Sequence, residues 1–312
     1  MIEASGLTKY YGDTCAIRDL DFTIEKGEIV GFLGPNGAGK TTTLKVLTSL
    51  LLPSRGTVKV GGVDVTQDPD RVRQQVGFLP EVPPLYTEMT VEGFLLFTAQ
   101  LRGLDTKKAR ERVGVTIELT NLQQVRHQVI DTLSHGFRQR VGISQAIVHD
   151  PTLLILDEPT KGLDPVQIVE FREMIRGLKG KHTILLSSHI LPEISQTVDR
   201  ILMLKDGEII ADGSEEELVS KFSSGQRLHV LIRGDATHAM DLLNGLEGIK
   251  GCHEDPRPAA PYRQASGPQT TLSVSTRGDR REAIAQALVE GGFGLLHLAP
   301  AEAELEAAFL RL

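Results

Sequence analysis

Short apolar runs recur along residues 1–220. The runs at residues 29–33, 76–79, 153–156 and 183–186 have the length of buried strands. Segments of helical spacing separate several of them, so strands and helices alternate along the chain. This alternation predicts an α/β domain with a mostly parallel sheet, whose ligands are expected at the carboxyl ends of the strands.

The amino-terminal residues have a different pattern, in which apolar and polar positions mix within each predicted strand. Residues 2–11 and 17–24 flank a turn at Gly12-Asp13, and residues 57–60 end at Gly61-Gly62. These features are typical of antiparallel strands. We therefore expect an antiparallel β subdomain beside the parallel sheet.

A helical insertion is predicted at about residues 85–150. Its apolar residues recur at helical spacing, and Thr90 and Asp105 are the expected N-caps of two of its helices. Helical spacing alone indicates ordinary core packing for most of these residues. The insertion and the surrounding strands together predict one domain over residues 1–220.

Residues 221–312 start a second pattern of alternating strands and helices. The predicted elements are a strand around 228–232, a helix at 238–246, a strand around 272–274, a helix at 283–289, a strand at 295–298 and a helix at 302–312. Residues 251–268 contain four prolines and are predicted to form an exposed loop. The order is close to that of a small α+β ferredoxin-like domain. We find no catalytic constellation in it and regard it as an accessory domain.

Composition narrows the class of protein. The chain has 312 residues, enough for about two domains, and its 40% hydrophobic and 24% charged content is ordinary for a soluble protein. No apolar stretch approaches a membrane span, and the amino terminus has no signal-peptide pattern. Two cysteines form neither a disulfide framework nor a metal motif, and the net charge of −7 argues against nucleic acid as a partner. A cytoplasmic location is expected.

The run at residues 29–33 leads into a phosphate-binding loop. Its spacing is G-x-x-x-x-G-K-[ST], which belongs between a buried strand and a helix and predicts a P-loop NTPase. The residues expected to bind ATP are Gly34, Pro35, Asn36, Gly37, Ala38, Gly39, Lys40, Thr41 and Thr42. We expect Lys40 to reach the β- and γ-phosphates and Thr41 to hold Mg²⁺. The alternative is a glycine-rich turn with an incidental lysine.

Two further predicted strand ends carry residues suited to phosphate chemistry. Asp157 and Glu158 follow the run at residues 153–156, and His189 follows the run at residues 183–186. The aspartate can bind Mg²⁺ through water, and the glutamate can act as general base for the water that attacks the γ-phosphate. Taken singly, a carboxylate pair is usually a solvated loop and a histidine is usually structural. Their common placement at strand ends favours a shared site.

With these motifs in order, residues 2–218 resemble the nucleotide-binding subunits of ATP-binding cassette (ABC) transporters. The segment Leu133-Ser-His-Gly-Phe137 is similar to the leucine-serine-glycine-glycine-glutamine signature of that family, and it departs from it at His135 and Phe137. The resemblance implies that Ser134 and Gly136 contact the γ-phosphate held by a second copy of the chain. Taken alone, the same serine would be a simple helix cap.

Other roles follow from the resemblance residue by residue. Tyr11 is expected to stack on adenine, Asp164 to lie across the interface of a homodimer, and His189 to hold the γ-phosphate. Glu81 stands where the family usually has a glutamine that contacts Mg²⁺ and senses the membrane partner. Lys161 replaces the commoner serine, and the sequence gives no account of this difference.

These observations predict the ATP-hydrolysing subunit of a membrane exporter, similar to the subgroup that includes gliding-motility ATPases. Two copies would enclose two MgATP, and a separate membrane permease would dock on the segment after Glu81. The protein would then be peripheral on the inner face of the cell membrane. The alternatives are an ABC ATPase that acts on ribosomes or DNA, an importer subunit, and a nucleotide switch or phosphotransferase that shares only the phosphate loop.

Overall fold

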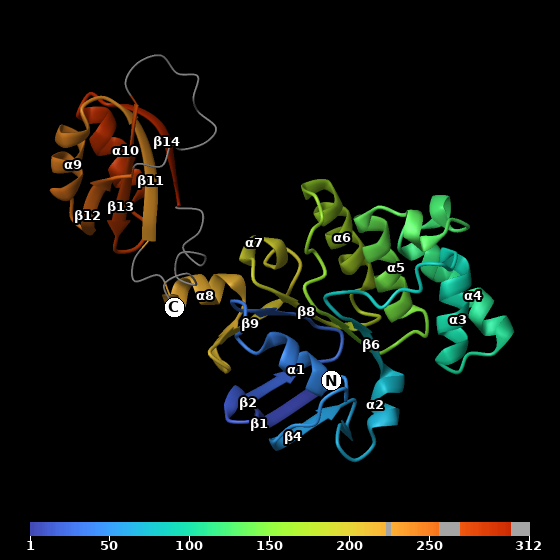
Figure 1. The fold of residues 1–312 in the computed structure, drawn as a ribbon. Helices are drawn as coiled ribbons and strands as arrows, with labels where there is room; N and C mark the ends of the chain where they lie inside the picture. The colour runs from blue at the N-terminus through green and yellow to red at the C-terminus, as the bar shows by residue number, and fades with distance from the viewer. Residues whose placement is uncertain (223–225, 256–268, 301–312) are drawn as a thin grey trace. The chain divides into compact units, whose positions relative to one another are not determined.

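The computed structural model describes residues 1–222, 226–255 and 269–300. The chain forms two compact units, Met1–Glu215 and Glu216–Leu312, each of which is described by itself (Figure 1). The helix predicted at residues 302–312 and most of the loop predicted at residues 251–268 lie outside the described residues.

The centre of the first unit is a six-stranded sheet with the order β10-β9-β3-β8-β7-β6. Its strands are β3 (Ile29–Leu33), β6 (Val76–Leu79), β7 (Leu153–Leu156), β8 (Thr183–Ser188), β9 (Arg200–Lys205) and β10 (Glu208–Gly213). All neighbours pair in parallel except β10, which is antiparallel to β9. Every residue of β3, β7 and β8 is buried, which explains why these strands read as apolar runs. The predicted mostly parallel sheet is confirmed.

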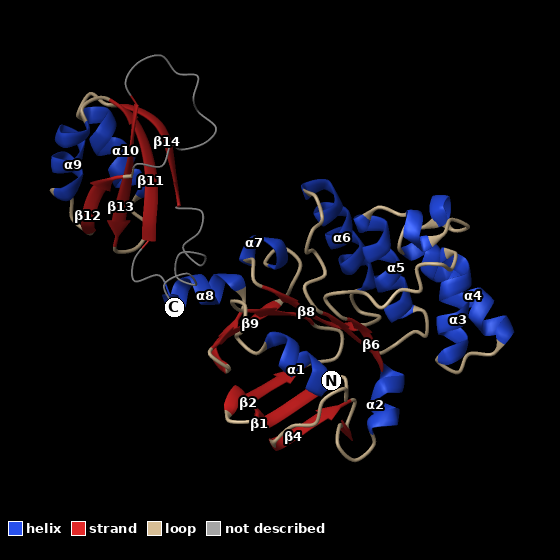
Figure 2. Ribbon diagram, in the orientation of Figure 1, coloured by secondary structure: helices blue, strands red, loops and turns tan. Residues whose placement is uncertain are grey.

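A second, antiparallel sheet has the order β2-β1-β4-β5. Its strands are β1 (Ile2–Tyr11), β2 (Thr14–Ile24), β4 (Arg55–Val60) and β5 (Val63–Asp64). Figure 2 shows α1 (Lys40–Leu47) between the two sheets, and Leu44 and Leu47 belong to the core that both sheets share. The rings of Phe22 and Phe32 join the sheets edge to face, with centroids 5.5 Å apart. This packing fixes the helix that follows the phosphate-binding loop.

The helical insertion has its own apolar core, which Val91, Phe94 and Leu95 help to form. Its elements are α3 (Val91–Leu101), α4 (Thr106–Leu119), the 3₁₀ turns η1 (Gln123–Val125) and η2 (Ile130–Thr132), and α5 (His135–Ile147). Thr90 and Asp105 accept hydrogen bonds from the first turns of α3 and α4, so both predicted N-caps are confirmed.

Some helices of the first unit are not foreseen by the periodicity. They are α2 (Pro69–Gln75), α6 (Pro165–Leu178) and α7 (Leu191–Ile194). The apolar pattern before Pro53 predicts that the helix after the phosphate-binding loop runs from Lys40 to about Leu51, whereas α1 ends at Leu47. Ser49 then takes a left-handed conformation with φ +54°, which a continuing helix cannot contain.

The second unit begins with α8 (Glu215–Phe222), which the periodicity does not foresee, and its further elements follow the order β-α-β-β-α-β. These are β11 (Gln226–Arg233), α9 (Ala236–Asn244), β12 (Ile249–Glu254), β13 (Gln269–Thr276), α10 (Arg281–Glu290) and β14 (Gly294–Pro300). The strands form an antiparallel sheet of order β12-β13-β11-β14, which is the ferredoxin-like arrangement expected. The exposed loop predicted from residue 251 is wrong over residues 251–254, where β12 pairs with β13 and Cys252 packs against the core.

Candidate functional site

The phosphate-binding loop joins the end of β3 to the start of α1. A Cβ on Gly34 would lie 2.5 Å from the Leu204 carbonyl oxygen, and one on Gly39 would lie 2.7 Å from the Ala16 carbonyl oxygen. Gly39 also has φ +97° and occupies the N-cap position of α1, where it has no side chain that could accept a hydrogen bond from the first turn. The first N–H groups of a helix have no partner within it, so this uncapped end offers them to an anion.

Lys40 is buried at the first position of α1. Its Nζ donates hydrogen bonds to the carbonyl oxygens of Gly34, at 2.7 Å, and Pro35, at 3.2 Å. The same nitrogen lies 3.2 Å from Oε1 of Glu158, and both side chains are less than a tenth exposed. The loop thus places a buried ammonium group directly against a buried carboxylate from another strand end.

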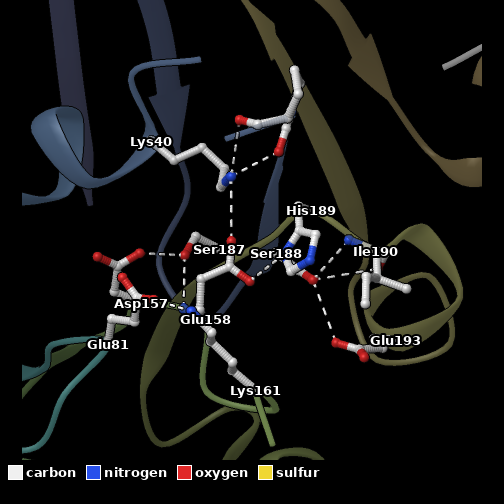
Figure 3. A network of polar contacts seen from close by, with 12 residues as sticks. Lys40, Glu81, Asp157, Glu158, Lys161, Ser187, Ser188, His189, Ile190 and Glu193 are labelled. Atoms are coloured by element: carbon white, nitrogen blue, oxygen red, sulfur yellow. Dashed lines mark hydrogen bonds and ion pairs between the residues drawn. The ribbon is translucent and has the colours of Figure 1, made fainter. Parts of the chain in front are cut away.

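Glu158 lies at the centre of a polar cluster, which Figure 3 shows. Its Oε2 is 2.8 Å from Nδ1 of His189, and its backbone N–H donates to Oγ of Ser187 at 2.9 Å. The Ser187 hydroxyl in turn donates to Oδ1 of Asp157 at 2.6 Å. Together, Lys40, Asp157, Glu158, Ser187 and His189 form what we call the Glu158 cluster. Lys40 follows β3 through the phosphate-binding loop, and the other members lie at the carboxyl ends of β7 and β8; apart from Ser187, these are residues that the sequence places at strand ends.

The backbone at Glu158 is unusual. The residue has φ +48°, in the left-handed region that a non-glycine residue seldom adopts. Its Oε1 is buried and has no hydrogen-bond partner within the described part of the chain, beyond the ion pair with Lys40. A strained, buried carboxylate with spare acceptor capacity is the arrangement expected of a group that takes a proton from water.

The donors present fit Mg²⁺ bound together with a nucleotide. Among the described residues, no group of three or more His, Cys, Asp or Glu side chains could hold a metal by itself. Mg²⁺ usually takes one or two protein ligands and completes its shell with water and substrate phosphates. Thr41, in the first turn of α1, and Asp157, buried at the end of β7, match that requirement.

The structure places the other predicted residues on different elements. Tyr11 ends β1 and is half exposed, with the Lys9 ammonium 5.6 Å from its ring centroid. Ser134 caps α5, Gly136 is buried in the first turn of that helix, and Asp164 caps α6. Within the described residues, the contacts of the Glu158 cluster do not include these side chains. Their predicted roles toward a nucleotide stay predictions.

Glu81 forms an ion pair with Lys161. It lies two residues beyond the end of β6, the strand beside β7. The structure therefore gives Glu81 a cationic partner within the chain, while its predicted role as a Mg²⁺ ligand stays a prediction.

Sequence reasoning missed two contacts that hold this site together. Ser187 links Asp157 to the backbone of Glu158, although its place before His189 at a strand end was a usable signal. Glu193 of α7 accepts a hydrogen bond from Thr160 at 2.5 Å, which ties the segment after Glu158 to the segment after β8. In each contact the two partners are distant in sequence, so no local sequence pattern predicts that they meet.

The chain is similar to known proteins over this region. The family model described as ABC transporter matches residues 17–161, which include the phosphate-binding loop and Glu158. The uncharacterized ABC transporter ATP-binding protein YxlF of Bacillus subtilis is 39% identical over 70% of this chain and 72% of its own length. The chain belongs to the ABC transporter ATP-binding proteins.

Two relatives with named roles fit the same family. The bacitracin transport ATP-binding protein BcrA of Bacillus licheniformis is 38% identical over 68% of this chain and 69% of its own. The daunorubicin/doxorubicin resistance ATP-binding protein DrrA of Streptomyces peucetius is 38% identical over 83% and 79%. A solved structure of an ATP-binding subunit of an ABC transporter is 32% identical, covers 71% of this chain and 93% of its own, and has a TM-score of 0.65. The fold is that of an ABC cassette, and the enzyme is an ATPase.

Proposed function

We propose that this protein is the ATP-hydrolysing subunit of a membrane exporter. The observation that carries the enzymatic part is the contact chain from Lys40 through Glu158 to His189 at three strand ends. Export is favoured by the names of the relatives, since BcrA is described by bacitracin transport and DrrA by drug resistance.

Each residue of the cluster has a part in the proposed reaction. Lys40 binds the β- and γ-phosphate oxygens, and Glu158 accepts a proton from the attacking water through Oε1, which in the nucleotide-free chain pairs only with Lys40 among the described residues. His189 orients that carboxylate from the other side. Thr41 and Asp157 hold Mg²⁺, which neutralises charge on the transferring phosphoryl group when it is bound.

A second copy of the chain completes the site in this proposal. Ser134 and Gly136 lie at the start of α5, and the N–H groups at the amino end of a helix favour binding of an anion. They would face the γ-phosphate held by the other copy, with Asp164 at the interface and Tyr11 against adenine. ATP binding would close this homodimer, and hydrolysis would release it.

The membrane partner is expected to dock on the segment after Glu81 and on α3. No helix in the described part of the chain is long and apolar enough to cross a membrane. Apolar side chains are nevertheless exposed on this surface, with Val82 79%, Tyr86 51% and Phe97 40% exposed. The Tyr86 and Phe97 rings meet edge to face at 5.6 Å. Such a patch favours a permease that holds the ATPase on the inner face of the membrane.

Affinity purification from gently solubilised membranes of the native host tests this proposal. A polytopic membrane protein should co-purify in stoichiometric amount. V82D should weaken that association, and V289D, at a valine of α10 in the second unit that is also mostly exposed (63%), should not. Recovery of a soluble assembly such as the ribosome, with no membrane protein, would instead favour an ABC ATPase that does not transport.

A further inference from the structure

Glu81 and Lys161 are two charged residues that the proposed chemistry does not use. They are 80 positions apart in the sequence, and the structure brings them together as a hydrogen-bonded ion pair. Glu81 follows β6, and Lys161 follows Glu158 in the segment after β7. Figure 3 shows both beside the Glu158 cluster. The contact therefore joins two adjacent strand ends of the site.

Lys161 also interacts with the Glu158 cluster, through both its backbone and its side chain. Its backbone N–H donates to the Glu158 carbonyl oxygen at 3.1 Å, which closes a turn over that residue. The pKa of Lys161 is raised, first by its hydrogen bond to Glu81 and the charge of that carboxylate, and further by the charge of Glu158. Lys161 is thus a second cation, after Lys40, that compensates carboxylates at this edge of the sheet.

Glu81 would otherwise add a free carboxylate beside the metal ligands. β6 and β7 pair in parallel with Leu79 opposite Leu156, and the Asp157 N–H donates to the Leu79 carbonyl oxygen at 2.9 Å. Glu81 and Asp157 therefore leave neighbouring strands one after the other. An unpaired anion at this position would attract Mg²⁺, whereas one that is paired with an ammonium group attracts it much less.

We propose that Glu81 and Lys161 form a charge-compensated positioning pair, which sets the Mg²⁺ concentration that the ATP site requires without contributing a ligand to the metal. The pair connects the segment that faces the permease to the segment that carries the catalytic base. The inference rests on the proposed roles of Asp157 and Glu158. It accounts for two of the departures from the family pattern, Glu81 and Lys161, with one contact.

The test compares wild type with E81Q, K161S and the double variant E81Q/K161S. Binding of a non-hydrolysable ATP analogue is measured by calorimetry across a Mg²⁺ titration, and ATP hydrolysis is measured in parallel. E81Q leaves an unpaired ammonium group and should raise the half-saturating Mg²⁺ concentration. K161S leaves an unpaired carboxylate and should lower it. Each shift should be about five-fold, the order that Coulomb's law gives in water for a unit charge near a divalent ion.

The double variant decides between positioning and ligation. It removes both charges, so its half-saturating Mg²⁺ concentration should return to within about two-fold of wild type, by the same electrostatic argument. If Glu81 were a metal ligand, the double variant would stay as impaired as E81Q. The proposal would also be overturned if wild type and the three variants gave indistinguishable Mg²⁺ titrations, because the contact between Glu81 and Lys161 would then have no influence on metal binding.

Two controls separate this inference from the proposed function. D70N/R73Q removes a comparable exposed ion pair on α2, which leads into the amino end of β6, whereas Glu81 follows its carboxyl end; this variant should leave the Mg²⁺ titration unchanged. The second control is E158Q. If E158Q abolishes the ATP hydrolysis seen in wild type, the assignment of Glu158 as general base stands, even where the Glu81–Lys161 pair has no effect on the Mg²⁺ titration. The differences among the variants should also shrink in about 1 M salt, where the Debye length is about 3 Å.

Discussion

Replacing Glu158 by glutamine isolates the proposed general base with little change of shape. The amide keeps the volume of the side chain and can still meet His189. The backbone hydrogen bond to Ser187 is not touched. The substitution removes the proton acceptor and the negative charge that faces Lys40 at 3.2 Å. The rate of ATP hydrolysis should therefore fall, whereas the affinity for ATP should be kept or rise.

Turnover should fall by about 10²- to 10⁴-fold, the range that a positioned general base contributes. ATP binding should be retained or become up to about ten-fold tighter, because Lys40 no longer has a carboxylate that competes with phosphate oxygens. The nucleotide-free protein should lose about 1–3 kcal/mol of stability. A buried charge that loses its partner costs about 3–5 kcal/mol, and Lys40 keeps the carbonyl oxygens of Gly34 and Pro35.

The assay combines steady-state phosphate release, equilibrium ATP binding, and thermal unfolding with and without ATP. D70N is the matched control, since it also removes one carboxylate from an ion pair but on an exposed helix. It should behave as wild type in all three measurements. Hydrolysis by E158Q at the wild-type rate would show that another group takes the proton, and the assignment of the base would be wrong.

Further predictions concern residues that support the site or the fold. S187A should cost about 1–3 kcal/mol of stability and lower turnover, because Asp157 loses its 2.6 Å hydrogen bond inside the core; unchanged turnover would argue against a positioning role. T160V should break the 2.5 Å link to Glu193 and reduce kcat about ten-fold with little effect on KM; a change in KM alone would contradict this. Burial lowers the pKa of His149 from 6.5 to about 4, so the unfolded chain binds the proton more readily, and stability present above pH 6.5 should fall by up to about 3 kcal/mol as the pH drops toward 4. H149Q should flatten that decline in chemical-denaturation curves, and an unaltered slope would refute the assignment.

Most of the cassette could be predicted from local pattern because its strands are either fully buried or end in diagnostic residues. The run at β7 is wholly apolar, and Asp157 and Glu158 mark its end. Thr90 and Asp105 cap helices as expected, because a cap is a contact over three residues. Where the relevant physics is local, the sequence was sufficient.

The missed elements depend on less local information. α6 starts with Asp164 as N-cap and a proline at its first turn, yet its apolar face is narrow, with Phe171, Ile175 and Leu178 buried. The cap was a usable signal that the short apolar face obscured. β12 has Lys250 and His253 exposed on a strand whose pairing with β13 lies across the segment 256–268. Its polar composition resembles a loop until the partner strand is known.

The side-chain network of the site could not be predicted for a related reason. Strand ends can be located from pattern, and the carboxyl edge of a parallel sheet can be inferred from topology. The pattern does not say that Ser187 bridges Asp157 to the next peptide, or that Lys161 meets Glu81. These contacts follow from the parallel register of β6, β7 and β8, which places Leu79 beside Leu156 and Leu156 beside Leu186.

The placement of charge in this sheet argues for function more strongly than any single motif does. Lys40, Asp157 and Glu158 are all at most 7% exposed, although burying an ion pair often costs more free energy than its attraction returns. Apolar residues would fill these positions at lower cost, since the strands before them are already buried on both faces. Glu81 and Lys161 differ, because their exposed side chains make a contact of small stability value. The buried charges are therefore best explained by the phosphate chemistry they serve, and the exposed pair by its effect on the charge beside them.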